Sequence, residues 1–351
     1  MALDSFLLKY KDLKNRLSEE DRRTLHDVEA LYSSALSSMQ ELKQNPDARE
    51  KLIETFGSIG DFLQNFVSKE ERVHVYSFET PRDMHGEASY LISKLRSHNT
   101  NNEEFVYFTQ RAYELLFNFT FLGSQNSKKN YFIIPTPVSE PVGNLAVHKI
   151  PNVDDDIQDT AVCVMLRGAL LPSMIMSKAI QEYSSTGYVT PFSLFKIRRN
   201  ESESEEALRY QVDLNASFFS VKSLNDKHLL FADPMNATGG SLITILRYLE
   251  ERKIRPRSIR LFTVISALRG VLNVLRNIDN IHIYTLWMDP MLNKKSYIMP
   301  GLGDAGDRIN GIDSEDSPRN IIQLISDYGL RVNNLYRAQV RAIEKSVFGN
   351  S

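Results

Sequence analysis

The chain has 351 residues, of which 42% are hydrophobic and 25% are charged, and its formal net charge is −2. This length and composition are typical of a globular protein with a full core and more than one folding unit. The near-neutral charge argues against a dedicated nucleic-acid surface. One cysteine, Cys163, excludes an internal disulfide framework and, among apolar neighbours, is expected to be buried.

The sequence shows no targeting or membrane-spanning signal. The first residues lack the basic stretch and apolar run of a signal peptide. No window approaches the roughly 20 apolar residues that a bilayer span requires. We therefore expect a cytoplasmic protein without a membrane partner.

The first elements in chain order are two amphipathic helices. Residues 18–42 have a cap at Ser18, an acidic first turn and an apolar seam at three- and four-residue spacing. Asn45-Pro46-Asp47 ends this helix, and a second apolar face follows from Leu52 to Phe66. The pattern predicts a helical hairpin. Such a seam suits docking on the chain's own domain, dimerisation or partner binding equally well.

From about residue 75, helical segments alternate with apolar runs. The predicted helices are Glu87–Arg96, Glu103–Leu122, Pro172–Tyr183, Ser241–Arg252 and Gly270–Arg276. The predicted strands are Tyr131–Ile134, Thr160–Leu166, Phe192–Ile197, His228–Ala232, Ser258–Ile265 and Ile281–Trp287. This order predicts an α/β fold with a mostly parallel sheet flanked by helices. After an acidic break at Asp313–Ser317, a helical pattern runs from Pro318 towards Phe348.

The segment His228–Ser241 has the composition of a phosphate-binding loop. An apolar strand leads to Asp233, and the small residues of 237–241 precede a helix. Backbone N–H groups, hydroxyls and the helix dipole in such a loop favour a phosphate. Asp233, at the carboxyl end of the strand, could accept hydrogen bonds from two sugar hydroxyls. The segment therefore predicts a site for a ribose 5-phosphate.

A second shaped loop is Tyr297-Ile-Met-Pro-Gly-Leu-Gly-Asp-Ala-Gly-Asp-Arg308. Its glycines and proline favour an irregular backbone that can present N–H and C=O groups to a flat ligand. That pairing suits uracil and rejects cytosine, which reverses the donor and acceptor at position 4. The other interpretation is a glycine-rich turn with solvated aspartates.

Together, Asp233-Pro-Met-Asn-Ala-Thr-Gly-Gly-Ser241 and the segment 297–308 resemble the uracil phosphoribosyltransferases, which have the type I phosphoribosyltransferase fold. Weaker similarity continues upstream through Leu95-Arg96 and Thr136-Pro137. The resemblance covers about residues 75–312. Residues 1–74 are then an N-terminal helical extension, and residues 313–351 a C-terminal helical extension.

The resemblance implies a role for each matching position. The implied catalytic residues are Asp233, Arg167, Arg199 and Asp304. The implied contacts to phosphoribosyl diphosphate are Arg167, Arg199, Asp233, Pro234, Met235, Asn236, Ala237, Thr238, Gly239, Gly240, Ser241 and Asp304. The implied contacts to uracil are Ile298, Gly303, Asp304 and Ala305. Mg²⁺ is the implied cofactor, held mainly by the substrate rather than by a protein metal site. A homo-oligomer and a purine-nucleotide activator are further expectations from the family.

The implied activity is transfer of the phosphoribosyl group to uracil, giving uridine monophosphate and diphosphate in pyrimidine salvage. One departure lies in Arg167-Gly-Ala-Leu-Leu-Pro172, where the family has Arg-Ala-Gly and a further glycine. A second is the acidic stretch after Arg199, in the family's mobile hairpin. The alternatives are an inactive relative that binds a nucleotide or uracil for regulation, and an enzyme that uses another base.

Overall fold

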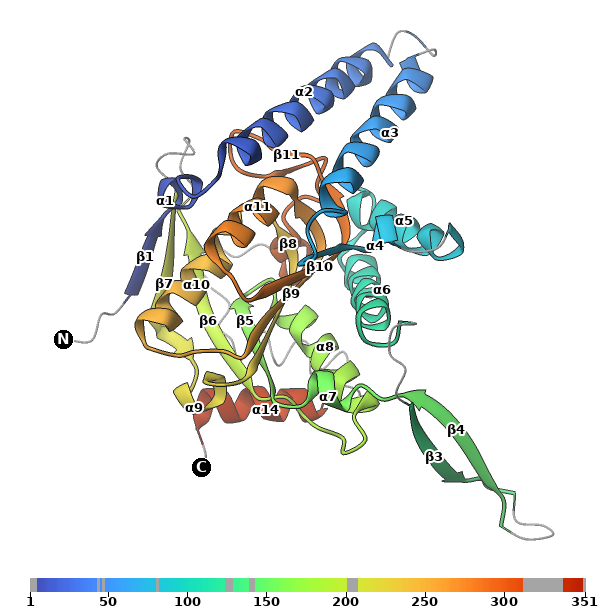
Figure 1. Ribbon diagram of the computed structural model, residues 1–351. Helices are drawn as coiled ribbons and strands as arrows, with labels where there is room; N and C mark the ends of the chain where they lie inside the picture. The colour runs from blue at the N-terminus through green and yellow to red at the C-terminus, as the bar shows by residue number, and fades with distance from the viewer. Residues whose placement is uncertain are drawn as a thin grey trace.

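The computed structural model describes residues 5–42, 45, 48–79, 82–123, 129–138, 143–200, 208–311 and 337–349. Its centre is an eight-stranded sheet with the strand order β1-β7-β6-β5-β8-β9-β10-β2 (Figure 1). The strands are β1 (Ser5–Lys9), β2 (Val73–Val75), β5 (Thr160–Leu166), β6 (Phe192–Arg199), β7 (Arg209–Phe218), β8 (His228–Asn236), β9 (Ser258–Ala267) and β10 (Ile281–Asp289).

The sheet is mostly parallel, as predicted. The strands from β6 to β2 pair in parallel, whereas β7 is antiparallel to both of its neighbours, β6 and β1. The strand β5 occupies the predicted range, and almost all of its side chains are buried, Cys163 among them. Strands buried on both faces appear as continuous apolar runs, which is why these runs predicted strands correctly.

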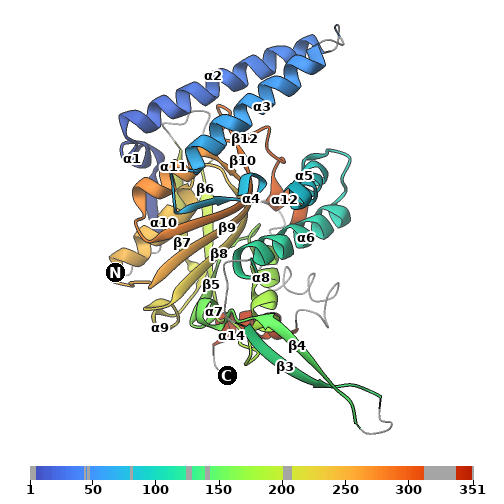
Figure 2. The same ribbon diagram turned by 45° about the vertical axis from the view of Figure 1, so that its right-hand side comes forward.

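Helices cover both faces of the sheet (Figure 2). On one face lie α10 (Gly240–Glu251) and α11 (Leu268–Asn277), which contact β7 and β10 respectively. On the other face lie α6 (Asn102–Phe121), α8 (Leu170–Tyr183) and α14 (Arg337–Phe348). The short helices are α1 (Tyr10–Lys14), α4 (Tyr76–Glu79), α7 (Asp154–Ile157), α9 (Val221–Leu224) and α12 (Ala305–Asn310), and α5 (Arg82–Arg96) packs against α6.

The predicted helical hairpin is formed by α2 (Glu19–Glu41) and α3 (Ala48–Val67). Ser18 caps α2 as predicted, because its hydroxyl accepts the N–H of Asp21 at 3.0 Å. The hairpin is docked on the body of the protein. Asp21 pairs with Arg276 of α11 at 2.8 Å, and Glu29 pairs with Arg269 at 2.7 Å.

The N-terminal segment also contributes two strands that the sequence did not predict. The strand β1 forms one edge of the sheet, and β2 forms the opposite edge. Both strands are short, with five and three residues, so neither gives a clear period-two pattern. Residues 5–75 thus reach both edges of the sheet.

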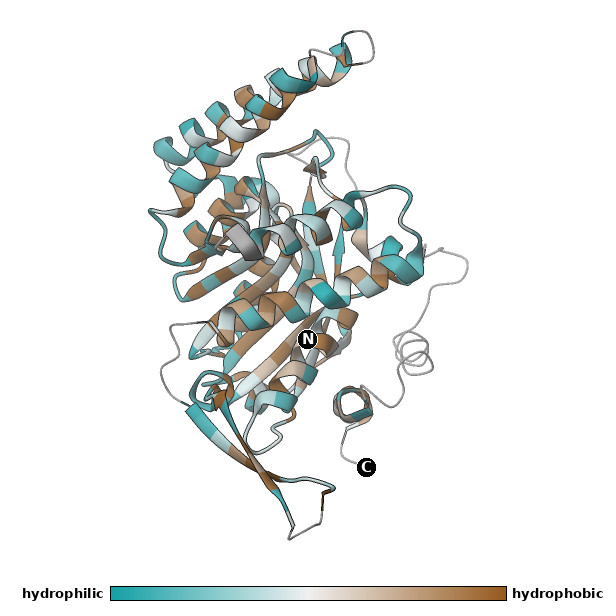
Figure 3. Cartoon of the chain, turned by 90° about the vertical axis from the view of Figure 1, so that its right-hand side faces the viewer, coloured by the Kyte–Doolittle hydropathy of each residue, from teal (hydrophilic) through white to brown (hydrophobic). Residues whose placement is uncertain are grey.

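One predicted strand lies outside the central sheet. Tyr131–Ile134 belongs to β3 (Lys129–Pro135), which pairs only with the antiparallel strand β4 (Leu145–Pro151) among the described residues. The prediction that this apolar run joins the parallel sheet is therefore wrong. The ribbon β3–β4 projects from the rest of the protein, and it carries hydrophobic residues, which are brown in Figure 3.

At the C-terminal end, α14 packs against β6 and α8, with Ile343 fully buried. The Ser346 hydroxyl donates to the Phe192 carbonyl at 2.6 Å. The predicted acidic break and the helical pattern that starts at Pro318 lie outside the described residues up to residue 336. Within the described ranges, none of the helices combines the length and the hydropathy that a bilayer crossing requires.

Candidate active site

A pocket of about 890 Å³ lies at the carboxyl ends of the parallel strands β5, β6 and β8. It is lined by Met165, Leu166, Arg167, Lys196, Ile197, Arg198, Arg199, Tyr210, Asp233, Met235, Asn236, Ala237, Thr238, Gly239, Gly240, Ser241, Leu242, Leu261, Ser296, Tyr297, Ile298, Gly303 and Asp304. The two loops singled out in the sequence therefore meet in one pocket. Of the implied contact residues, Pro234 and Ala305 are buried and do not line it.

The phosphate loop, residues 233–241, connects β8 to the start of α10. Gly239 has a φ of 75°, in the left-handed region that favours glycine, and it precedes the first residue of the helix. The loop lies close to α11, since a Cβ at Gly270 would come within 2.5 Å of the Ala237 carbonyl oxygen. Its backbone thus faces the pocket at a helix N-terminus, where phosphates bind favourably.

Tyr210 of β7 contacts the phosphate loop from the opposite side. Its hydroxyl lies 2.5 Å from that of Thr238, and a Cβ at Gly240 would come within 2.2 Å of its ring. The Thr238 hydroxyl also accepts the N–H of Gly240 at 3.2 Å. Tyr210 was not predicted as a site residue. The alternation of polar and apolar residues in 209–218 could have revealed its strand.

Asp233 is half-buried in the pocket wall, and one of its carboxylate oxygens accepts the N–H of Met235 at 3.0 Å. Burial raises the pKa of Asp233 to about 7, and the nearby Asp304 carboxylate adds to the rise. A bound cation would favour the ionised form. Asp304 caps α12, because its side chain accepts the N–H of Asp307 at 3.0 Å.

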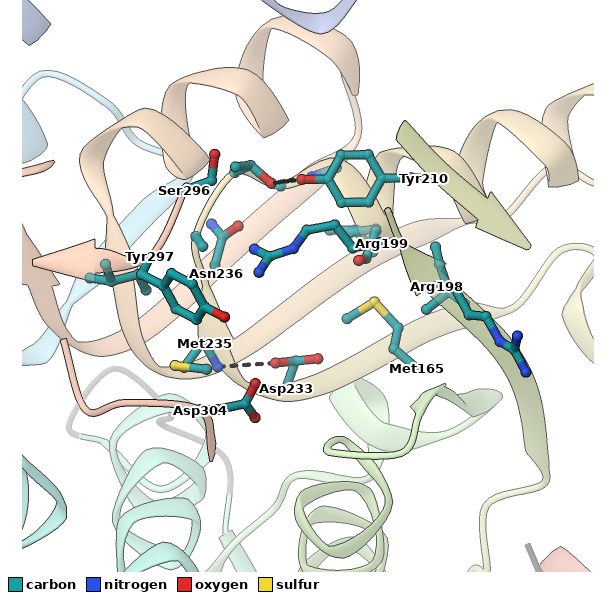
Figure 4. Close-up of a pocket in the computed structure, with 18 of the residues that line it drawn as sticks. Met165, Arg198, Arg199, Tyr210, Asp233, Met235, Asn236, Ser296, Tyr297 and Asp304 are labelled. Atoms are coloured by element: carbon teal, nitrogen blue, oxygen red, sulfur yellow. Dashed lines mark hydrogen bonds between the residues drawn. The ribbon is translucent and has the colours of Figure 1, made fainter. Parts of the chain in front are cut away.

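The two implied arginines have different surroundings. The side chain of Arg199 points into the pocket, with its guanidinium carbon 5.2 Å from the centre of the Tyr297 ring, whereas Arg198 points away (Figure 4). Arg167 is held at α12, where it pairs with Asp307 and donates to the Gly311 carbonyl at 2.5 Å. A diphosphate in the pocket would therefore compete with Asp307 for Arg167.

The altered segment after Arg167 does not fill the pocket. Ala169, Leu170 and Leu171 are buried, and α8 begins at Leu170, so these bulky residues belong to the core. Gly168 lies beside the base loop, residues 297–308, because a Cβ there would be 3.3 Å from the Gly306 Cα. The acidic stretch of the hairpin β6–β7 falls at 201–207, outside the described residues.

The base loop is held by residues that do not line the pocket. Asp289, which is almost fully buried, accepts the N–H of Gly301 at 3.0 Å and pairs with Arg96. Arg96 also donates to the Gly301 carbonyl at 3.0 Å, and Arg308 donates to that of Leu302 at 2.8 Å. Ile298 pairs with Leu292 in the two-stranded sheet of β11 (Met291–Leu292) and β12 (Ile298–Met299). These contacts support the backbone of the loop at Ile298, Gly301 and Leu302.

Comparison with known proteins identifies one family. The model of the uracil phosphoribosyltransferase family matches residues 84–311, more than half of the chain. The uracil phosphoribosyltransferase of Dictyoglomus thermophilum is 28% identical over 227 residues, 65% of this chain and 96% of the relative. That of Mycoplasma genitalium is 26% identical over 220 residues, 63% of this chain and 93% of the relative. That of Shouchella clausii is 43% identical over 96 residues, 26% of this chain and 45% of the relative. The chain is therefore a member of the uracil phosphoribosyltransferase family.

Proposed function

We propose that this protein transfers the 5-phosphoribosyl group from phosphoribosyl diphosphate to uracil, forming uridine monophosphate and diphosphate. The observation that carries the proposal is the meeting of the phosphate loop and the base loop in one pocket. The 5-phosphate would lie against the backbone of residues 237–241, and Asp233 would accept the ribose hydroxyls. Ile298 and Gly303 would present backbone groups to uracil, beside Asp304.

In the reaction, the bond between C1 of the ribose and the diphosphate oxygen breaks, and a bond from C1 to N1 of uracil forms. The N1 proton leaves to solvent. Arg199 and Arg167 would offset the charge that grows on the leaving diphosphate. Because both loops hold their ligands at the same pocket, orientation supplies a large part of the rate enhancement. A side-chain nucleophile is not required.

Mg²⁺ fits the pocket as a cofactor held largely by substrate. Among the described residues, no group of three or more His, Cys, Asp or Glu side chains is placed to bind a metal. The pocket does offer the carboxylates of Asp233 and Asp304, and Mg²⁺ commonly combines one or two carboxylates with substrate phosphates and water. When bound, Mg²⁺ would neutralise charge on the diphosphate oxygens.

The direct test is formation of uridine monophosphate from uracil and phosphoribosyl diphosphate with Mg²⁺. We expect product from the wild type, little from Asp233→Asn, and wild-type rates from Asp61→Asn, a matched change on the exposed face of α3. A wild type that forms no uridine monophosphate would contradict the proposal.

One observation favours the alternative of a binding protein without turnover, namely the pairing of Arg167 with Asp307. If this pair prevents catalysis, the wild type will bind phosphoribosyl diphosphate without releasing diphosphate, and Asp307→Asn will raise turnover. If the pair only orders the empty pocket, the wild type will turn over without this change.

A homo-oligomer stays a prediction, and the ribbon β3–β4 supports it. Six large hydrophobic side chains on and beside the ribbon are 46–66% exposed, namely Tyr131, Ile133, Ile134, Val138, Leu145 and Val147. A two-stranded ribbon is marginally stable by itself, and clustered exposed apolar residues mark contact surfaces. We propose a second copy of this chain as their partner. The cytoplasmic location and the purine-nucleotide activator also stay predictions.

A further inference from the structure

The first ten described residues hold the hairpin that carries Arg199. The strand β1 pairs with β7 over five residues, from Ser5 opposite Asp213 to Lys9 opposite Arg209. On its other side, β7 pairs with β6, where Arg199 lies opposite Tyr210. Leu8, Tyr210 and Arg199 thus form one row across three strands. Without β1, β7 would be an exposed edge strand of the sheet.

The helix α1 begins at Tyr10, immediately after β1, and Tyr10 is linked to the phosphate loop through Asn273. Tyr10 is fully buried, and its backbone N–H donates to the Leu208 carbonyl at 3.0 Å. Its hydroxyl lies 3.5 Å from the side-chain amide nitrogen of Asn273 on α11. That nitrogen donates to the Thr238 carbonyl at 2.9 Å, inside the phosphate loop.

The phosphate loop is therefore held from two sides, and both supports rest on the same short segment. Tyr210 contacts Thr238 and Gly240 from β7, and β7 is paired with β1. Asn273 of α11 donates its side-chain N–H to the Thr238 carbonyl, and the same amide nitrogen contacts the hydroxyl of the buried Tyr10. Asn273 is fully buried, so its bond to this carbonyl lies out of reach of competing water.

We propose that strand β1 and Tyr10 position the phosphoribosyl-binding side of the pocket, and that Tyr10 is a positioning residue for the phosphate loop. This inference rests on the proposed function. A loop whose backbone N–H groups are fixed before the ligand arrives binds a phosphate without a further ordering cost. Loosening the support weakens binding of phosphoribosyl diphosphate in the ground and transition states alike. The KM for phosphoribosyl diphosphate therefore rises, while kcat and the KM for uracil stay near wild type.

The test compares Tyr10→Phe and Asn273→Ala with Lys11→Ala, a control at an exposed neighbour on α1. Binding of Mg²⁺–phosphoribosyl diphosphate without uracil is measured by calorimetry, and steady-state kinetics gives kcat and both KM values. Tyr10→Phe is expected to weaken binding by about 3- to 10-fold and Asn273→Ala by at least about 10-fold, because the second change leaves a buried carbonyl unpaired. Lys11→Ala should match the wild type. Wild-type affinity in both test variants would overturn the inference.

A ligand-free measurement separates this inference from the proposed function. Hydrogen exchange of peptides covering residues 237–241 should be faster in Tyr10→Phe and Asn273→Ala than in the wild type and Lys11→Ala. Exchange in β5, away from α1, should be unchanged, which distinguishes local loosening from global destabilisation. Unchanged exchange at 237–241 in both variants would overturn the positioning role. A wild type that binds no phosphoribosyl diphosphate would overturn the proposed function instead.

Discussion

Arg96 of α5 and Asp289 at the end of β10 form a two-pronged ion pair behind the base loop, with nitrogen–oxygen distances of 3.1 and 2.5 Å. Both residues also bind the backbone of Gly301, Arg96 through its carbonyl and Asp289 through its N–H. The pair therefore sets the path of the loop that would hold uracil, although neither side chain lines the pocket.

We expect Asp289→Ala to lower the free energy of unfolding by about 3 kcal/mol, because it leaves Arg96 without its carboxylate in a site where that arginine is only 20% exposed. The KM for uracil should rise more than that for phosphoribosyl diphosphate. Urea unfolding and steady-state kinetics measure the two effects. As a control, Glu114→Ala, which removes an exposed pair with Arg111, should cost less than about 1 kcal/mol. Equal costs for the two variants would argue against the role of the pair.

The pKa of Asp233 predicts a pH dependence. Burial raises this pKa to about 7, so below that pH the free enzyme carries a protonated carboxyl, which would accept the ribose hydroxyls of the proposed substrate less well. The value of kcat/KM for phosphoribosyl diphosphate should therefore fall as the pH is lowered through about 7. Asp233→Asn should lack this inflection while keeping any contribution from ionisation of the substrate. An identical profile in both proteins would assign the inflection to the substrate.

Arg198 and Arg199 provide a matched pair of neighbours that point in opposite directions. Arg199→Met should lower kcat/KM for phosphoribosyl diphosphate by about 10- to 100-fold, because the variant loses a charge that would face the diphosphate in the proposed reaction. Arg198→Met should change it by less than about 3-fold, as expected for an exposed charge in salt. Similar losses in both variants, in assays at equal ionic strength, would show that only the overall charge of the hairpin matters.

Gly240 is the position in the phosphate loop where added volume should be least tolerated. A Cβ there would lie 2.2 Å from the Tyr210 ring, so Gly240→Ala must displace the ring or the loop. We expect a loss of about 1–3 kcal/mol in the free energy of unfolding and a higher KM for phosphoribosyl diphosphate. Gly60→Ala on α3 meets nothing within 4 Å and should be neutral or stabilising by up to about 1 kcal/mol. Thermal unfolding of the two variants would reveal the contrast.

The ribbon β3–β4 allows a test of assembly. Ile133 and Val147 are register partners with 65% and 62% exposure, so replacing both by serine should raise the fraction of smaller species in sedimentation experiments. Val221→Ser, at an exposed site on α9 outside the ribbon, should leave the sedimentation profile unchanged. An unchanged profile for the double variant would exclude this surface as the oligomer contact.

The sequence predicted the central strands well, and it singled out two loops that line one pocket in the structure. The run Thr160–Leu166 is apolar on both faces because both faces are buried, and glycine at 239 reflects a required positive φ. Local composition carried these signals. Local composition could not show that the apolar run at Tyr131–Ile134 forms an exposed ribbon. Hydrophobicity indicates that a segment favours burial, but it does not identify the surface against which the segment packs.

The contacts that support the two loops could not be predicted from the sequence. Arg96 and Asp289 are 193 positions apart, and Tyr10 and Asn273 are 263 apart, so only the fold brings them together. Strand β7 is an exception. Its alternation from Arg209 to Phe218 is a local signal that would have predicted the strand and, with it, the direction of Tyr210.

The two strands at the ends of the segment 5–75 cover the edges of the family-matched region. Strand β1 protects one side of the eight-stranded sheet and β2 the other, yet both precede residue 84, where the family match begins. A fragment limited to residues 84–311 would leave β7 and β10 with unpaired backbone groups along their outer sides. Such strands pair readily with other chains, so that fragment should aggregate on expression more than the longer chain does. The segment before residue 84 thus covers strand edges that would otherwise promote aggregation of the family-matched region.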